Sequence, residues 1–137
     1  MSLYTPDVVT LWVFQAEPAQ EVSPLFEWSY SEDGEAEPSR FAAMYQLRPY
    51  DTDFAFWERG ASAFDLLTSV AMMYRTLDEQ AVNRLPEGEW NGLYLIGGQA
   101  GEEWQAPEDR PPMPHGIVAV EHVSFKFVDS FHVVVRP

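Results

Sequence analysis

The 137-residue chain has no cysteine, few basic residues and no long uninterrupted apolar run. The absence of cysteine excludes disulfide bonds and thiolate metal sites, and it agrees with a reducing compartment. No segment approaches the ~18 consecutive apolar residues that a membrane helix needs. The N-terminus also lacks a basic region followed by an apolar stretch. We therefore expect neither a signal peptide nor a membrane span, and we expect a cytoplasmic protein.

The shortage of basic residues leaves a strong and uneven negative charge. Eight Lys and Arg residues stand against 22 Asp and Glu residues, which gives a formal net charge of −14. Before Arg40 there is no basic side chain, whereas the acidic ones there are Asp7, Glu17, Glu21, Glu27, Glu32, Asp33, Glu35 and Glu37. This charge repels phosphates and anionic lipids, so we expect no nucleic-acid partner and no membrane partner. It attracts a basic protein or a cationic small molecule, or else it serves solubility alone.

The composition and length indicate one folded domain. Hydrophobic residues make up 46% of the chain and aromatic residues 15%, which is enough to bury a core. We predict a single α+β domain over residues 1–137. It would consist of an antiparallel sheet of about five to seven strands, with one long and one short helix packed on one face.

The long helix is predicted over residues 61–77. Its apolar residues recur every three or four positions, as a helix requires: Phe64, Leu67, Ala71, Tyr74 and Leu77. Ser62 occupies the expected N-cap position, with Asp65 three residues later. The short helix is expected to begin at Asp78 and to end at Pro86.

Strands are predicted where β-branched and aromatic residues run together or alternate with polar ones. These segments are residues 8–14, 25–31, 40–48, 93–96, 116–128 and 131–135. Segment 40–48 also suits a helical turn, but its alternation favours a strand, and 50–59 is either a connection or another short strand. Turns are expected at 32–34 and 129–130. The last two segments would form a central hairpin, and a homodimer would cover any part of its apolar surface left exposed.

The segment 99–115 is expected to be an irregular loop. It contains four prolines and four acidic residues, which do not fit a helix or a strand. A loop of this length in a compact domain is more often a binding element or a flap than a plain connection.

Residue patterns for catalysis and metal binding are weak. The three histidines, His115, His122 and His132, would lie apart on the final strands, and no Gly-x-Ser-x-Gly motif occurs. We therefore predict no catalytic residue, no metal site and no cofactor. An acid/base enzyme remains a third reading, and it would draw on Asp51, Asp53, Glu121 or His122.

Aromatic and acidic residues lie close together along the chain, and this pattern supports two functions. The main hypothesis is a non-enzymatic acidic protein that binds a basic protein partner, as small inhibitors and immunity proteins do. The alternative is a small-molecule-binding domain whose aromatic and acidic cavity takes cationic or aromatic ligands. The candidate exposed aromatic anchors and their acidic neighbours are Trp57, Trp90, Trp104, Asp51, Asp53, Glu102 and Glu103.

Overall fold

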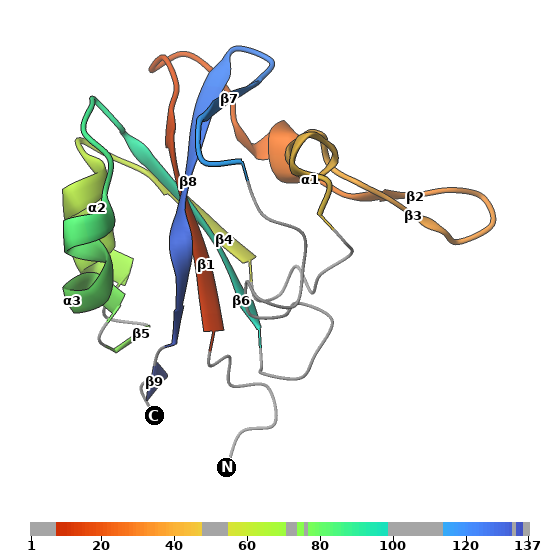
Figure 1. The fold of residues 1–137 in the computed structure, drawn as a ribbon. Coiled ribbons are helices and arrows are strands. Elements are labelled where there is room, and N and C mark those ends of the chain that lie inside the picture. Colours follow the sequence, from red (N-terminus) through yellow and green to blue (C-terminus); the bar gives the residue numbers. More distant parts are fainter. Residues whose placement is uncertain are drawn as a thin grey trace.

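A five-stranded antiparallel sheet forms the centre of the molecule (Figure 1). The computed structural model describes residues 8–47, 55–70, 74–75, 77–98, 114–132 and 134–135. The sheet has the strand order β4-β6-β1-β8-β7, and each neighbouring pair runs antiparallel. Its strands are β1 (Val8–Gln15), β4 (Ala55–Arg59), β6 (Gly92–Gly98), β7 (Ile117–Val120) and β8 (Val123–His132). The predicted α+β class with an antiparallel sheet is confirmed.

Short helices and two small ribbons make up the rest of the secondary structure in the described part of the chain. The α-helices are α1 (Arg40–Tyr45), α2 (Ala63–Val70) and α3 (Leu77–Ala81), and the 3-10 helices are η1 (Ser23–Phe26) and η3 (Val82–Arg84). One ribbon pairs β2 (Ser29–Tyr30) with β3 (Ala36–Glu37), and the other pairs β5 (Tyr74–Arg75) with β9 (Val134–Val135). Figure 1 shows α2 and α3 on one side of the sheet and α1 on the other.

The central strand β1 is buried on both faces of the sheet, and its residues are apolar on both sides. Alternate residues of β1 point to opposite faces, so Trp12 and Phe14 enter one cluster while Leu11 and Val13 enter the other. The aromatic cluster, beneath α1 and η1, includes Trp12, Phe14, Phe26, Phe41, Tyr45, Tyr94, Phe125 and Phe127. The aliphatic cluster, beneath α2 and α3, includes Val9, Leu11, Val13, Leu66, Leu67, Val70, Leu77, Leu93 and Leu95.

Helix α2 begins where the sequence predicts and ends earlier. The Ser62 hydroxyl accepts a hydrogen bond from the Asp65 backbone N–H at 3.2 Å, so the predicted N-cap is confirmed. The expected helix over 61–77 is too long, because Tyr74 and Arg75 pair with β9 instead. The pairing of β5 with β9, which is distant in sequence, thus outweighs the helical spacing of the apolar residues. No helix in the described part of the chain is long and apolar enough to cross a membrane.

Two predicted strands are wrong. Segment 25–31 begins inside η1, where Pro24 suits the first turn of a helix, and only Ser29 and Tyr30 form a strand. Segment 40–48 contains α1, the alternative that the sequence left open. The Ser39 hydroxyl caps α1 by accepting from the Ala42 N–H at 3.0 Å.

The final hairpin turns at a different place from the one predicted. Val120 pairs with Val123, so the turn consists of Glu121 and His122, and Glu121 takes a positive φ of 56°. Such a φ is what a two-residue hairpin turn requires at its first central position. Segment 129–130 lies within β8, where a register shift opposite Leu11 and Trp12 marks a β-bulge. The expected hairpin across 129–130 is therefore wrong.

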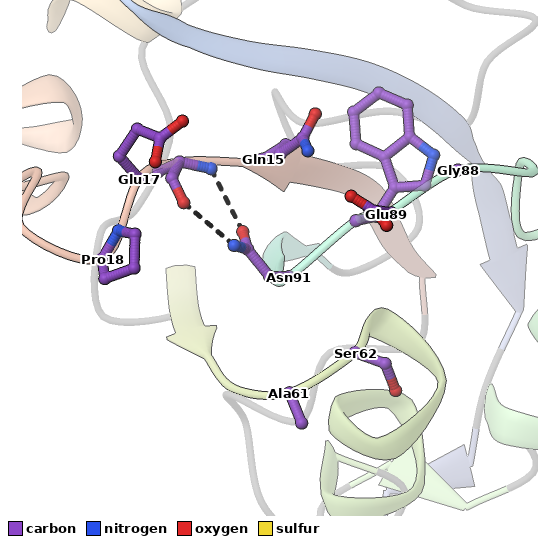
Figure 2. Close-up of a pocket in the computed structure, with 10 residues that line it drawn as sticks. Gln15, Glu17, Pro18, Ala61, Ser62, Gly88, Glu89 and Asn91 are labelled. Carbon is purple, nitrogen blue, oxygen red and sulfur yellow. Dashed lines mark hydrogen bonds between the residues drawn. The ribbon is translucent and has the colours of Figure 1, made fainter.

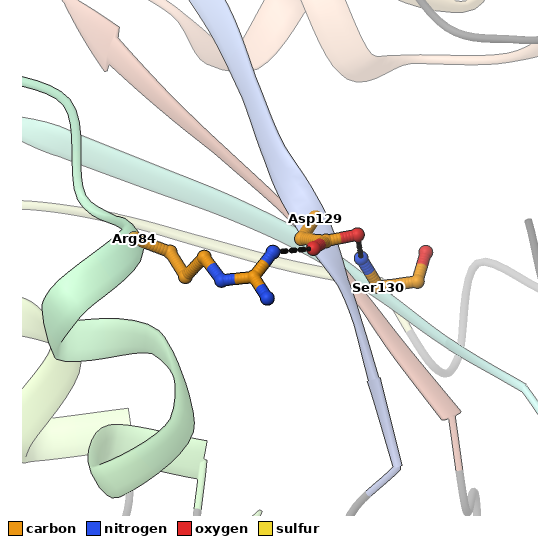
Figure 3. Close-up of polar contacts among 3 residues, drawn as sticks. All are labelled: Arg84, Asp129 and Ser130. Carbon is orange, nitrogen blue, oxygen red and sulfur yellow. Dashed lines mark hydrogen bonds and ion pairs between the residues drawn. The ribbon is translucent and has the colours of Figure 1, made fainter.

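Polar contacts explain why β8 continues through this segment. Arg84 of η3 forms an ion pair with Asp129, whose other carboxylate oxygen accepts from the Ser130 N–H at 2.8 Å (Figure 3). The Ser130 hydroxyl lies 2.7 Å from that of Thr10 on β1. Asp129 and Ser130 are thus held by a helix and by the neighbouring strand.

The apolar residues of β8 are largely covered, since β8 lies inside the sheet. Phe125 and Phe127 belong to the aromatic cluster, and Phe131 belongs to the aliphatic one. The exposed part of the final hairpin is β7, an edge strand on which Ile117 is 65% exposed. A homodimer across that edge stays a prediction.

Candidate functional site

The β2–β3 ribbon extends away from the sheet as an arm (Figure 1, orange). We define the arm as residues 27–37. Its turn is held by hydrogen bonds from the Ser31 N–H to the Glu35 carbonyl and from the Gly34 N–H to the Ser31 carbonyl, each 2.9 Å long. Gly34 has a φ of 82°, as the predicted turn at 32–34 requires. The arm therefore has a defined shape.

The arm carries negative charge and the highly exposed aromatic ring of Tyr30. All five of its acidic residues are exposed, and it has no basic residue: the acids are Glu27, Glu32, Asp33, Glu35 and Glu37. Tyr30 is 72% exposed, the largest value among the exposed large hydrophobic residues of the described chain. Tyr30 belongs to the predicted strand 25–31, but it lies on the arm, which leaves the sheet.

A hollow of about 590 Å³ lies at one end of the sheet, beside the start of α2 (Figure 2). The end of β1, the start of α2 and the segment before β6 form its walls. Its lining consists of Gln15, Ala16, Glu17, Pro18, Ala61, Ser62, Gly88, Glu89, Trp90 and Asn91.

Asn91 holds these walls together. Its side-chain oxygen accepts from the Ala16 N–H at 3.1 Å, and its side-chain N–H donates to the Ala16 carbonyl at 2.9 Å. Its backbone N–H donates to the Phe14 carbonyl, and its own carbonyl accepts from the Gly60 N–H, both at 3.0 Å. One residue thus joins β1, the segment before β6 and the approach to α2.

Other hydrogen bonds fix the rim of the hollow. The Arg59 guanidinium donates to the Gln20 carbonyl at 2.6 Å and to the Glu17 carbonyl at 2.7 Å. The Trp90 indole N–H donates to the Glu87 carbonyl at 3.0 Å, and the Trp90 carbonyl accepts from the Ala63 N–H at 2.8 Å. The backbone around the hollow is therefore extensively hydrogen-bonded.

Two exposed carboxylates line this hollow. Figure 2 shows Glu17 and Glu89 on either side of Asn91. Within the described residues, neither carboxylate has a hydrogen bond or an ion pair with a basic side chain. Carboxylates arranged in this way can accept hydrogen bonds from a cation.

The predicted aromatic anchors have different outcomes. Trp57 lies on β4, is 36% exposed, and has its ring centroid 6.1 Å from that of Phe26. Trp90 is only 7% exposed, so its expected role as an exposed anchor is wrong, because its ring packs into the aliphatic cluster. It nevertheless lines the hollow, and its binding role stays a prediction. Trp104 lies outside the described residues.

The predicted acidic neighbours all lie outside the described residues: Asp51, Asp53, Glu102 and Glu103. The two remaining acid/base candidates, Glu121 and His122, form an exposed hairpin turn. The Glu121 carboxylate is paired with Arg40 at 2.7 Å, and both side chains are largely exposed.

The histidines are also separate. His132 pairs with Val8 on β1, His122 is in the hairpin turn, and the His115 ring lies 5.9 Å from that of Phe127. Among the residues that the structure describes, no group of three or more His, Asp or Glu side chains could hold a metal ion.

Sequence reasoning missed Glu17, Glu89 and Asn91 as residues of one site. Glu17 follows β1 and Asn91 precedes β6, and the pairing of Phe14 with Gly92 brings these two strand ends together. Only the strand register could have revealed this proximity. Comparison with protein-family models, with curated proteins and with solved structures finds no match to this chain.

Proposed function

We propose that this protein binds a basic protein partner without catalysing a reaction on it, and that the arm is its main docking element. The main support for this proposal is the composition of the arm. It presents five exposed carboxylates and no basic side chain on a ribbon that extends from the sheet. In this role the protein would cover a basic surface of its partner, as small inhibitors and immunity proteins do.

Charge and shape support different parts of this proposal. Clustered carboxylates speed the approach of a basic surface and disfavour acidic competitors. Tyr30 supplies a large ring with a hydroxyl at its tip, and tyrosine is among the residues that most often carry binding energy at interfaces. The hydrogen-bonded turn reduces the conformational freedom that binding would otherwise remove.

The test compares two variants with the same change in charge. The arm variant carries Glu32→Gln, Asp33→Asn, Glu35→Gln and Glu37→Gln. The matched control changes four exposed acids elsewhere: Glu21→Gln, Asp65→Asn, Glu79→Gln and Glu87→Gln. Basic proteins captured from a cell extract at low salt are identified by mass spectrometry, and the affinity of the identified partner is then measured by titration.

The wild type and the control should capture the same basic protein, and the arm variant should bind it at least about tenfold more weakly. Affinity should also fall as NaCl is added, because salt screens exposed charges. Equal binding by the arm variant, or no basic protein captured at low salt, would contradict the proposal.

A further inference from the structure

We propose that the hollow lined by Glu17 and Glu89 is a second binding site, which takes an ammonium or guanidinium group carried on a short aliphatic chain. This site is separate from the arm, and its chemistry does not depend on the proposed function. Its volume of about 590 Å³ lies within the range of about 300–1,000 Å³ that is usual for small-molecule sites.

The walls of the hollow are already formed. The carbonyl groups of Phe14, Ala16 and Glu17 accept hydrogen bonds from Asn91 or Arg59. Those of Trp90 and Asn91 accept from the backbone N–H groups at the start of α2 and before it. A ligand would therefore enter without rearranging this backbone, which lowers the free-energy cost of binding.

Apart from Gln15, the polar side chains of the lining divide into two kinds. Those of Asn91, Ser62 and Trp90 form hydrogen bonds with backbone groups. Those of Glu17 and Glu89 are carboxylates that make no hydrogen bond or ion pair with another described residue, so they are available as acceptors. Two acceptor groups with negative charge favour a donor-rich cation and disfavour an anion.

The apolar lining accounts for the aliphatic chain. Pro18 and Ala61 are exposed and offer carbon surface in the same hollow as the two carboxylates. A methylene chain would remove this surface from water, and each buried CH₂ group favours binding. The hollow thus combines charge with apolar contact, whereas a simple metal ion would use only the charge.

Two sources could supply this chemistry: a free amine, or a Lys or Arg side chain of a protein. Four probes distinguish them in calorimetric titrations of the full chain at low salt. Putrescine and agmatine represent free cations, and short capped peptides with one internal Lys or one internal Arg represent side chains. Tighter binding of the first pair identifies a small molecule, and tighter binding of the second pair identifies a protein side chain.

The site variant is Glu17→Gln with Glu89→Gln, and its matched control is Glu32→Gln with Glu35→Gln on the arm. We expect the site variant to bind the best probe at least about tenfold more weakly and the control to stay within about twofold of the wild type. The Trp90 indole N–H resonance, assigned with Trp90→Phe, should shift on titration of the wild type.

Absence of binding by all four probes would overturn the proposal, as would equal binding by the site variant. The control changes the arm and leaves the hollow intact. Probe binding to the hollow should therefore be the same whether or not the arm docks a protein partner. The two proposals can therefore fail independently.

Discussion

At the scale of single residues, Tyr45 combines deep burial with an unsatisfied hydroxyl. It is 5% exposed, and its ring lies 5.1 Å from Phe41 and 5.8 Å from Trp12. The hydroxyl finds no hydrogen-bond partner among the described residues. A buried unsatisfied polar group costs about 1–3 kcal/mol. Tyr45→Phe should therefore raise the free energy of unfolding by about 1 kcal/mol at neutral pH, measured by urea denaturation.

The same variant should change the response to alkaline pH. Burial raises the pKa of Tyr45, so the unfolded chain loses this proton first as pH rises above about 10. The folded state then binds more protons than the unfolded state, and stability falls with rising pH. Tyr45→Phe should make this alkaline loss smaller. A variant less stable than the wild type at neutral pH would show that the hydroxyl is satisfied.

Gly92 is a second residue with a sharp steric requirement. A Cβ atom added there would lie 2.2 Å from the ring of Phe14, which is fully buried. Overpacking of a core typically costs about 1–3 kcal/mol. Gly92→Ala should therefore lower the free energy of unfolding by about 2–3 kcal/mol in urea denaturation.

The matched control for this substitution is Gly116→Ala. An added Cβ at Gly116 meets no atom within 4 Å, so its effect should stay within about 0.5 kcal/mol. Equal stabilities of the two variants would mean that Phe14 moves aside without cost.

At the scale of elements, the arm is separable from the folded core. None of its described residues belongs to either core cluster. Replacement of residues 29–37 by a short Gly-Ser linker should therefore change the free energy of unfolding by less than about 1 kcal/mol. Thermal unfolding followed by circular dichroism measures this effect, and a much larger loss would assign the arm a structural role.

Several elements could be predicted because their local patterns point one way. The apolar run of β1 and the Ser62 cap of α2 are examples. The sequence could not decide between a helix and a strand for segment 40–48, since Phe41 and Tyr45 fit both an alternating strand and one face of a helix. The Ser39 cap was the available signal for a helix. The bulge that keeps Asp129 within β8 depends on distant residues and leaves no local pattern.

At the scale of the whole molecule, the net charge of −14 acts on stability as well as on binding. Like charges repel one another more in the compact state than in the unfolded chain. Addition of NaCl from about 10 mM to 200 mM shortens the Debye length from about 30 Å to below 10 Å. The free energy of unfolding should then rise by about 1 kcal/mol, measured in urea.

The four-site arm variant described above provides the comparison, since it reduces the magnitude of the net charge from 14 to 10. Its stability should depend less on salt than that of the wild type. Loss of stability on adding salt would show that favourable ion pairs outweigh repulsion. Salt should therefore have opposite effects on stability and on partner binding.

Long-range strand pairing also limits what the sequence can predict about the site. Net charge predicts a basic or cationic ligand from composition alone, and this stays a prediction. The grouping of Glu17 with Glu89 required the β1–β6 register, which no local pattern specifies. Of the predicted site residues, Trp90 lines the hollow although it is only 7% exposed, whereas the sequence predicted an exposed anchor.

The position of β1 between β6 and β8 has a consequence for biosynthesis. Thr10 contacts Ser130, which is 120 positions further along the chain. β1 leaves the ribosome before β8, so one of its two edges stays unpaired until β8 has emerged. Pairings of such long sequence separation slow folding and expose strand edges to aggregation in the meantime. The nascent chain would therefore benefit from a chaperone until β8 is available.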